Sequence, residues 1–85
     1  MQNAMSKNDQ EELAQEIAKG LGEEQLLPIY RSFVRRYPEE VVRRAYQETI
    51  AFPAERIHKT RGAVFNYLLK KYVREVQSGT QNPGD

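Results

Sequence analysis

The chain has 85 residues and no cysteine, which allows one small domain and excludes disulfides, thiolate metal sites and cysteine nucleophiles. Its charge is divided unevenly. Residues 1–24 hold two Lys or Arg against six Asp or Glu (−4), and residues 25–85 hold eleven against six (+5). This division predicts a basic body that attracts an acidic or polyanionic partner.

Neither a membrane span nor a signal peptide is expected. The sequence has no apolar run near the roughly 20 residues that cross a bilayer, and residues 1–10 lack the apolar centre of a signal sequence. A chain without cysteine also suits a reducing compartment. We therefore expect a soluble, cytoplasmic protein, and its small core leaves a homodimer as an alternative to a monomer.

The first predicted helix begins at Asn8 or Asp9 and ends near Lys19 or Gly20. Asn and Asp accept hydrogen bonds from the exposed amides at a helix start, and glycine suits a helix end. The apolar stripe of this helix consists of Leu13, Ile17 and Leu21. The residues before the helix, 1–7, are predicted to be a flexible N-terminus.

Two further helices are expected on either side of Pro38. Pro28 places the start of the second helix close to Gln25 or later, and Pro38 provides the first-turn dihedral of the third, so almost no loop separates them. The third helix ends at Phe52-Pro53. The apolar stripes are Leu26, Leu27, Tyr30, Phe33, Val34 and Tyr37 in the second helix, and Val41, Val42, Ala45, Tyr46, Thr49 and Ile50 in the third.

A short connector, residues 54–59, leads to the last helix, which Thr60 caps. The apolar face of the last helix consists of Phe65, Leu68, Leu69, Tyr72 and Val76. Gly79 ends that helix, and residues 78–85 are predicted to be a polar, disordered tail. No segment favours a strand, so the sequence predicts an all-α fold, a small bundle of three to four short helices within residues 8–77.

The sequence offers little for catalysis. His58 is the only histidine, and it has no cysteine to activate and no second imidazole beside it. The carboxylates of Glu39-Glu40 suit the first turn of a helix better than acid–base chemistry. Neither a Gly-rich phosphate loop nor a cluster with metal-ligand spacing occurs. We therefore expect a protein that is not an enzyme and that has no cofactor and no metal.

A basic surface around the last helix is the candidate site, because Lys and Arg that neutralise phosphates drive binding to nucleic acid. Backbone amides at the start of this helix would favour phosphate as well. Tyr67 falls between the stripe residues Val64 and Leu68, so it is the tyrosine expected to be exposed and to contact a base, while the others pack. The expected contacts are Arg56, His58, Lys59, Arg61, Tyr67, Lys70 and Lys71.

Ion pairs within the chain are expected to use part of the positive charge. A spacing of four residues lets Arg35 pair with Glu39 and Arg44 pair with Glu48, and each pair contributes about 0.2 to 0.5 kcal/mol on an exposed helix. A solvated basic surface without a partner is therefore the alternative to a binding site.

The first helix supports a second hypothesis, a protein-interaction or dimerisation module. Its apolar residues stand among acidic ones, so this helix could dock in a groove of a protein partner or against a second copy of the chain. Packing within the chain's own core is the competing expectation, because so short a chain needs the buried area. The residues of this alternative surface are Leu13, Ile17, Leu26 and Leu27.

Residues 37–70 carry a recognisable series of motifs. Tyr37-Pro38-Glu39-Glu40-Val41-Val42-Arg43-Arg44-Ala45 is followed by Thr49, by Ile57 to Lys59, and by Arg61-Gly62-Ala63-Val64-Phe65-Asn66-Tyr67-Leu68-Leu69-Lys70. This stretch, about half the chain, resembles the C-terminal helical segments of some plasmid and phage replication-initiation proteins. In those segments a helix ending in Ala-x-x-x-Thr precedes a short linker and Gly-Ala-x-Phe-x-x-Leu-Leu. The resemblance implies a replication-associated accessory domain that contacts DNA or a helicase and has no catalytic residue.

Overall fold

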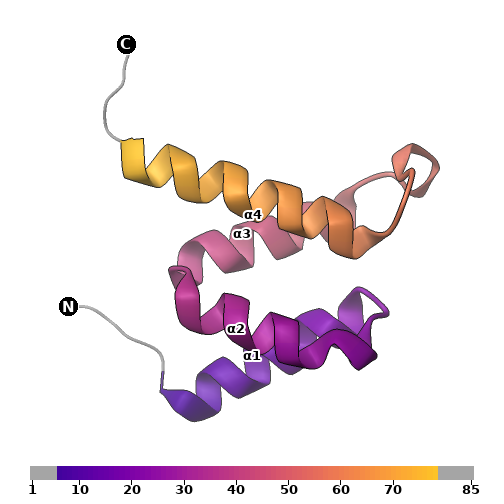
Figure 1. The fold of residues 1–85 in the computed structure, drawn as a ribbon. Helices are drawn as coiled ribbons and strands as arrows, with labels where there is room; N and C mark the ends of the chain where they lie inside the picture. The colour runs from indigo at the N-terminus through magenta and orange to yellow at the C-terminus, as the bar shows by residue number, and fades with distance from the viewer. Residues whose placement is uncertain (1–5, 79–85) are drawn as a thin grey trace.

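The computed structural model describes residues 6–78, and within them the fold is all-α, as predicted. The helices form two hairpins, α1 with α2 and α3 with α4 (Figure 1). Residues 1–5 of the predicted flexible N-terminus and residues 79–85 of the predicted tail lie outside the described part. The elements are α1 (Lys7–Gly20), the 3-10 helix η1 (Glu24–Leu26), α2 (Leu27–Arg36), α3 (Glu39–Ala51), the 3-10 helix η2 (Ala54–Arg56) and α4 (Arg61–Ser78).

Helix α1 begins slightly earlier than the sequence predicted. The Ser6 hydroxyl oxygen accepts a hydrogen bond from the Asp9 amide at 3.1 Å, so Ser6 is the N-cap and Asp9 lies inside the first turn. Ser at the cap with an acid three residues later is a strong helix start, which explains the difference. The predicted end is confirmed, since α1 stops at Gly20 and Gly22 then takes a left-handed φ of +72°.

Pro38 joins α2 to α3 without a loop, as predicted. Tyr37 is extended, with φ −112° and ψ 152°, and Pro38 is the N-cap of α3. The two helices therefore leave this corner in different directions, and each becomes one arm of a different hairpin (Figure 1).

The same corner makes one predicted ion pair wrong. Arg35 lies in the last turn of α2 and Glu39 begins α3, so the spacing of four residues does not bring them together on one helix. Glu39 instead accepts a hydrogen bond from Arg43 Nε at 2.7 Å. The predicted pair of Arg44 with Glu48, within α3, is present at 3.5 Å.

The core fills the space between the two hairpins. Phe65 of α4 is fully buried, and its ring centroid lies 5.7 Å from that of Tyr30 and 6.0 Å from that of Phe33, both on α2. These aromatic contacts join the second hairpin to the first. Around them pack the buried residues Leu13, Ala14, Ile17, Ala18, Leu21, Val34, Val41, Val42, Ala45, Leu68, Leu69 and Tyr72.

The apolar side of α1 belongs to this core. Leu13 and Ile17 are 2% and 0% exposed, and the partly buried Leu26 and Leu27 pack against the same cluster. The expectation of packing within the chain is confirmed, since these residues supply the buried area that a short chain needs. The assignment of Leu13 and Ile17 to a partner-binding surface is therefore corrected, because a partner reaches neither side chain in this fold.

Two residues of the predicted apolar stripes are exposed instead. Ile50 is 46% exposed because it follows the fully buried Thr49 by one position, a rotation of about 100° around α3. Val76 is 52% exposed although it shares the side of Tyr72. Its helix, α4, has 18 residues against 13 in α3, so the last turn of α4 extends past the helix that would cover it.

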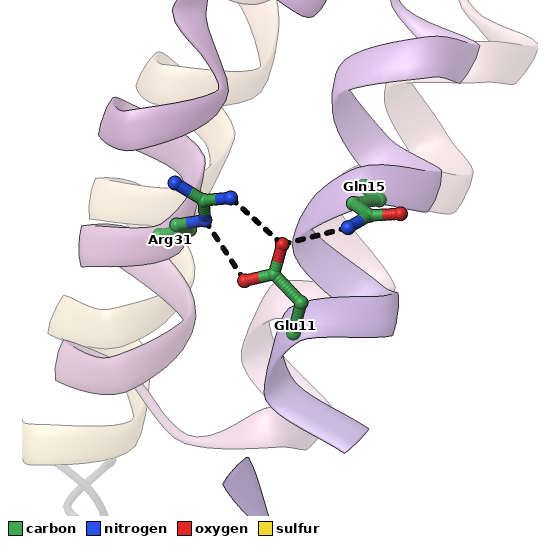
Figure 2. A network of polar contacts seen from close by, with 3 residues as sticks. All are labelled: Glu11, Gln15 and Arg31. Atoms are coloured by element: carbon green, nitrogen blue, oxygen red, sulfur yellow. Dashed lines mark hydrogen bonds and ion pairs between the residues drawn. The ribbon is translucent and has the colours of Figure 1, made fainter. Parts of the chain in front are cut away.

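An ion pair links the exposed sides of α1 and α2 (Figure 2). Nε and Nη2 of Arg31 donate to the two carboxylate oxygens of Glu11 at 2.8 and 2.9 Å, and Gln15 donates to one of them at 2.7 Å. The hydrogen bond from Arg31, followed by that from Gln15, lowers the pKa of Glu11. The two-pronged geometry fixes how the hairpin arms align, while exposure to water keeps its contribution to stability small.

Candidate nucleic-acid interface

Helix α4 lies along one edge of the molecule, packed against α3, and its other side faces solvent (Figure 1). We call this side the outer face of α4. It consists of the exposed residues Ala63, Tyr67, Lys70, Arg74 and Gln77, which recur at spacings of three or four. It contains cations and an aromatic ring but no acidic side chain.

Tyr67 is exposed, as predicted, with 66% of its surface accessible. The other tyrosines pack: Tyr30 and Tyr72 are 3% and 4% exposed, and Tyr37 and Tyr46 are half-buried against the core. Among the described residues, Tyr67 has neither a hydrogen bond nor a ring contact. Its ring is therefore accessible to a planar ligand.

Lys70 and Lys71 are both exposed on α4, and neither forms a hydrogen bond or an ion pair with another described residue. Their surroundings differ. The pKa of Glu48 on α3 is lowered mainly by the hydrogen bond from Tyr72, and the charge of Lys71 adds to this effect. Lys71 thus lies toward α3 and is partly compensated, whereas Lys70 lies centrally on the outer face of α4.

The connector that precedes α4 presents three more predicted contacts, Arg56, His58 and Lys59, all exposed. Its first half is the single turn η2, in which the Ile57 amide donates to the Ala54 carbonyl at 3.1 Å. The side chain of Ile57 is half-buried. This segment is the short connector that the sequence predicted.

Arg61 has a different position from the one expected. Its Nη1 donates to the carbonyl oxygens of Thr49 and Phe52 at 2.7 and 3.2 Å, so the guanidinium caps the C-terminal end of α3. Carbonyl groups at a helix end lack partners within the helix and carry partial negative charge. Arg61 therefore ties the start of α4 to the end of α3, and this charge is not turned outward for a phosphate.

The start of α4 is also not open to phosphate in the way the sequence suggested. Thr60 caps it as predicted, with its hydroxyl oxygen 3.1 Å from the Ala63 amide. The carboxylate of Glu23 lies against Gly62, where a Cβ would collide with it and would stand 2.8 Å from the Tyr30 hydroxyl. Glu23 supplies the negative charge that the positive end of a helix dipole favours, and it would repel a phosphate there. The predicted role for these amides is corrected.

Three arginines outside this region are used within the chain, while Arg35 and Arg36 of α2 are exposed and form no hydrogen bond or ion pair with another described residue. Arg31 pairs with Glu11, and Arg43 pairs with Glu39. The guanidinium carbon of Arg44 lies 3.8 Å from the centre of the Tyr72 ring, and this side chain also pairs with two carboxylates of α3 and α4. The basic clusters of α3 therefore contribute little free charge, as the expectation of internal ion pairs suggested.

The structure thus divides the predicted contacts into three groups. Tyr67, Lys70 and Lys71 share α4, the residues Arg56, His58 and Lys59 share the connector before it, and Arg61 points inward. Arg74 was missed, although its spacing of seven from Tyr67 is visible in the sequence. Arg74 also takes part in an interaction within the chain.

Neither protein-family models, nor curated protein sequences, nor solved structures give a match to this chain. Within residues 6–78 no helix combines the length and apolar character required to cross a membrane. The same residues contain no group of three or more His, Cys, Asp or Glu arranged to hold a metal ion.

Proposed function

We propose that this chain is a non-enzymatic, DNA-associated binding module. Its basic surface consists of the connector residues Arg56, His58 and Lys59 together with Lys70 and Lys71 on α4. These side chains contact phosphates, and affinity comes from release of the counterions that the phosphates hold. The similarity of residues 37–70 to segments of replication-initiation proteins makes replication the process we assign to it, and we assign it to the cytoplasm.

One observation carries this proposal. Arg56, Lys59, Lys70 and Lys71 are exposed and make no hydrogen bond or ion pair with any other described residue. Arg31, Arg43 and Arg44 are held by carboxylates, whereas Arg35 and Arg36 of α2 are exposed without such a partner among the described residues. Cations that form no ion pair keep their charge available for a polyanion, although the charge of Lys71 is partly compensated by Glu48.

The alternative function keeps only part of its predicted surface. Leu13 and Ile17 are buried in the monomer, whereas Leu26 and Leu27 are partly buried. Acidic side chains of α1 remain on the surface, but one of them, Glu11, already pairs with Arg31. No described contact therefore favours a dimerisation module over the DNA-associated one.

Charge reversal at Lys59 and Lys70 tests the proposal. The K59E/K70E variant removes one cation from the connector and one from α4, without touching a residue that holds the fold together. The slope of log affinity against log salt is negative, and each lost phosphate contact reduces its magnitude by about 0.7 on a single strand and about 0.9 on duplex DNA. We expect this variant to bind more weakly and with a slope flatter by about 1.4 to 1.8.

The matched control is K7E/K19E, which makes the same change in net charge on α1, where both lysines are exposed. Fluorescence anisotropy between about 50 and 200 mM salt compares the two variants with the unmodified chain. Equal losses in both variants would show that only net charge matters. That result would exclude the proposed surface.

A further inference from the structure

We propose that the outer face of α4 binds single-stranded DNA, with one base stacked on Tyr67 and the flanking phosphates bound by Lys70 on this face and by Lys71 at its border with α3. This inference rests on the proposed function and deepens it, because it assigns the strand state of the ligand. It follows from the placement of Tyr67, from the cations beside it, and from the groups at the start of α4.

Tyr67 has the exposure that stacking requires. Its ring is 66% exposed, while the chain's four other tyrosines are buried or half-buried against the core. The exposed neighbour one turn earlier on the outer face is Ala63, whose small side chain leaves space beside the ring. An aromatic ring with both room and water around it can accept the face of an unstacked base.

The cations lie at the right spacing for the same ligand. Lys70 and Lys71 follow Tyr67 by three and four residues, so their Cβ atoms are about 5 to 6 Å from that of Tyr67. Neither lysine has a hydrogen-bond or ion-pair partner within residues 6–78. A strand with a base on Tyr67 therefore passes its backbone within reach of two ammonium groups, the combination of stacking and charge that binds single strands.

We expect duplex DNA to bind the outer face of α4 more weakly than a single strand does. Base faces inside a duplex are covered by their neighbours, so a tyrosine ring reaches only edges and sugars. A helix that reads the major groove usually inserts its N-terminal residues. At the start of α4 the Glu23 carboxylate lies against Gly62, and the Arg61 guanidinium is bound to the end of α3. The first turn of this helix thus faces a carboxylate and holds its own arginine inward, while the exposed cations Arg56 and Lys59 lie on the connector before it.

The test uses an oligothymidylate of about 12 nucleotides and an abasic strand of the same length and charge. Affinities are measured by fluorescence anisotropy at about 50 mM salt for the unmodified chain, Y67A and Y67F. We expect Y67A to bind the oligothymidylate about 5- to 140-fold more weakly, the loss of one stacked base, while its affinity for the abasic strand stays unchanged. Y67F, which keeps the ring, should bind both strands as the unmodified chain does.

Two results would overturn the inference. If Y67A binds the oligothymidylate as tightly as the unmodified chain, or loses equal affinity for both strands, no base stacks on this ring. Salt-sensitive binding to the abasic strand would still support the proposed function in either case. If the unmodified chain binds neither strand at low salt, the proposed function fails and the stacking site fails with it.

Discussion

Tyr30 shows how one buried side chain makes stability depend on pH. Burial, and then the hydrogen bond that its hydroxyl donates to Glu23 at 2.6 Å, raises the pKa of Tyr30 above its ordinary value. Below about pH 10 both the folded and the unfolded chain keep this proton, so the group adds no pH dependence there. At higher pH the unfolded chain loses the proton first, and the fold becomes progressively less stable.

We therefore expect the free energy of unfolding to fall above about pH 10, with Tyr30 contributing up to about 1.4 kcal/mol per pH unit. The Y30F variant lacks this proton, so its stability should fall less steeply over the same range. Urea denaturation at pH values from about 8 to 11 measures both slopes. Parallel slopes for Y30F and the unmodified chain would contradict the role assigned to Tyr30.

At the scale of elements, Arg61 links the end of α3 to the start of α4. Replacement by methionine keeps the aliphatic bulk but leaves the Thr49 and Phe52 carbonyls without their charged donor. We expect R61M to lower the free energy of unfolding by about 1 to 3 kcal/mol. R56M is the matched control, because Arg56 is exposed and has no ion-pair partner within residues 6–78, and it should change stability by less than about 0.5 kcal/mol.

Urea denaturation at neutral pH compares these two variants. If R61M were as stable as R56M, the contacts of Arg61 with the two carbonyls would be incidental. The guanidinium would then be available for a phosphate, as the sequence alone suggested.

Sequence patterns predicted the elements well because their signals are local. Proline restriction at Pro38, the Thr60 cap and the apolar spacing of α4 act within a few residues, so they can be seen without the fold. The roles of Arg61 and Glu23 could not be predicted in the same way. Arg61 contacts carbonyls nine and twelve residues away, and Glu23 meets α4 only after the two hairpins pack together.

In the candidate site, too, local features could be predicted from the sequence and contacts between helices could not. Helical spacing was enough to select Tyr67 as the exposed aromatic, because exposure on one helix follows from its own stripe. Which cations stay unpaired depends on neighbouring helices. Arg44, for example, lies over Tyr72 and also pairs with Glu75, both on α4. Charge counting alone therefore overestimates the free positive charge of α3.

At the scale of the whole molecule, the acidic first helix and the basic last helix lie apart. Helix α1, which carries much of the acidic first segment, and helix α4 lie at opposite edges of the two-hairpin arrangement (Figure 1). The sequence showed the −4 and +5 halves, which meet in the fold where Glu11 pairs with Arg31 and where Glu23 lies against Gly62, while α1 and α4 themselves are separated by α2 and α3. A polyanion approaching such a molecule is repelled by one edge and attracted by the other, which favours one orientation of binding.

The most direct measurement is the salt dependence with which the unmodified chain binds single-stranded DNA. Contacts from three to four cations predict a slope of log affinity against log salt of about −2 to −3 between about 50 and 200 mM salt. A slope in this range would support phosphate binding by the connector and α4. Absence of binding at about 50 mM salt, or binding that does not respond to salt, would contradict the account.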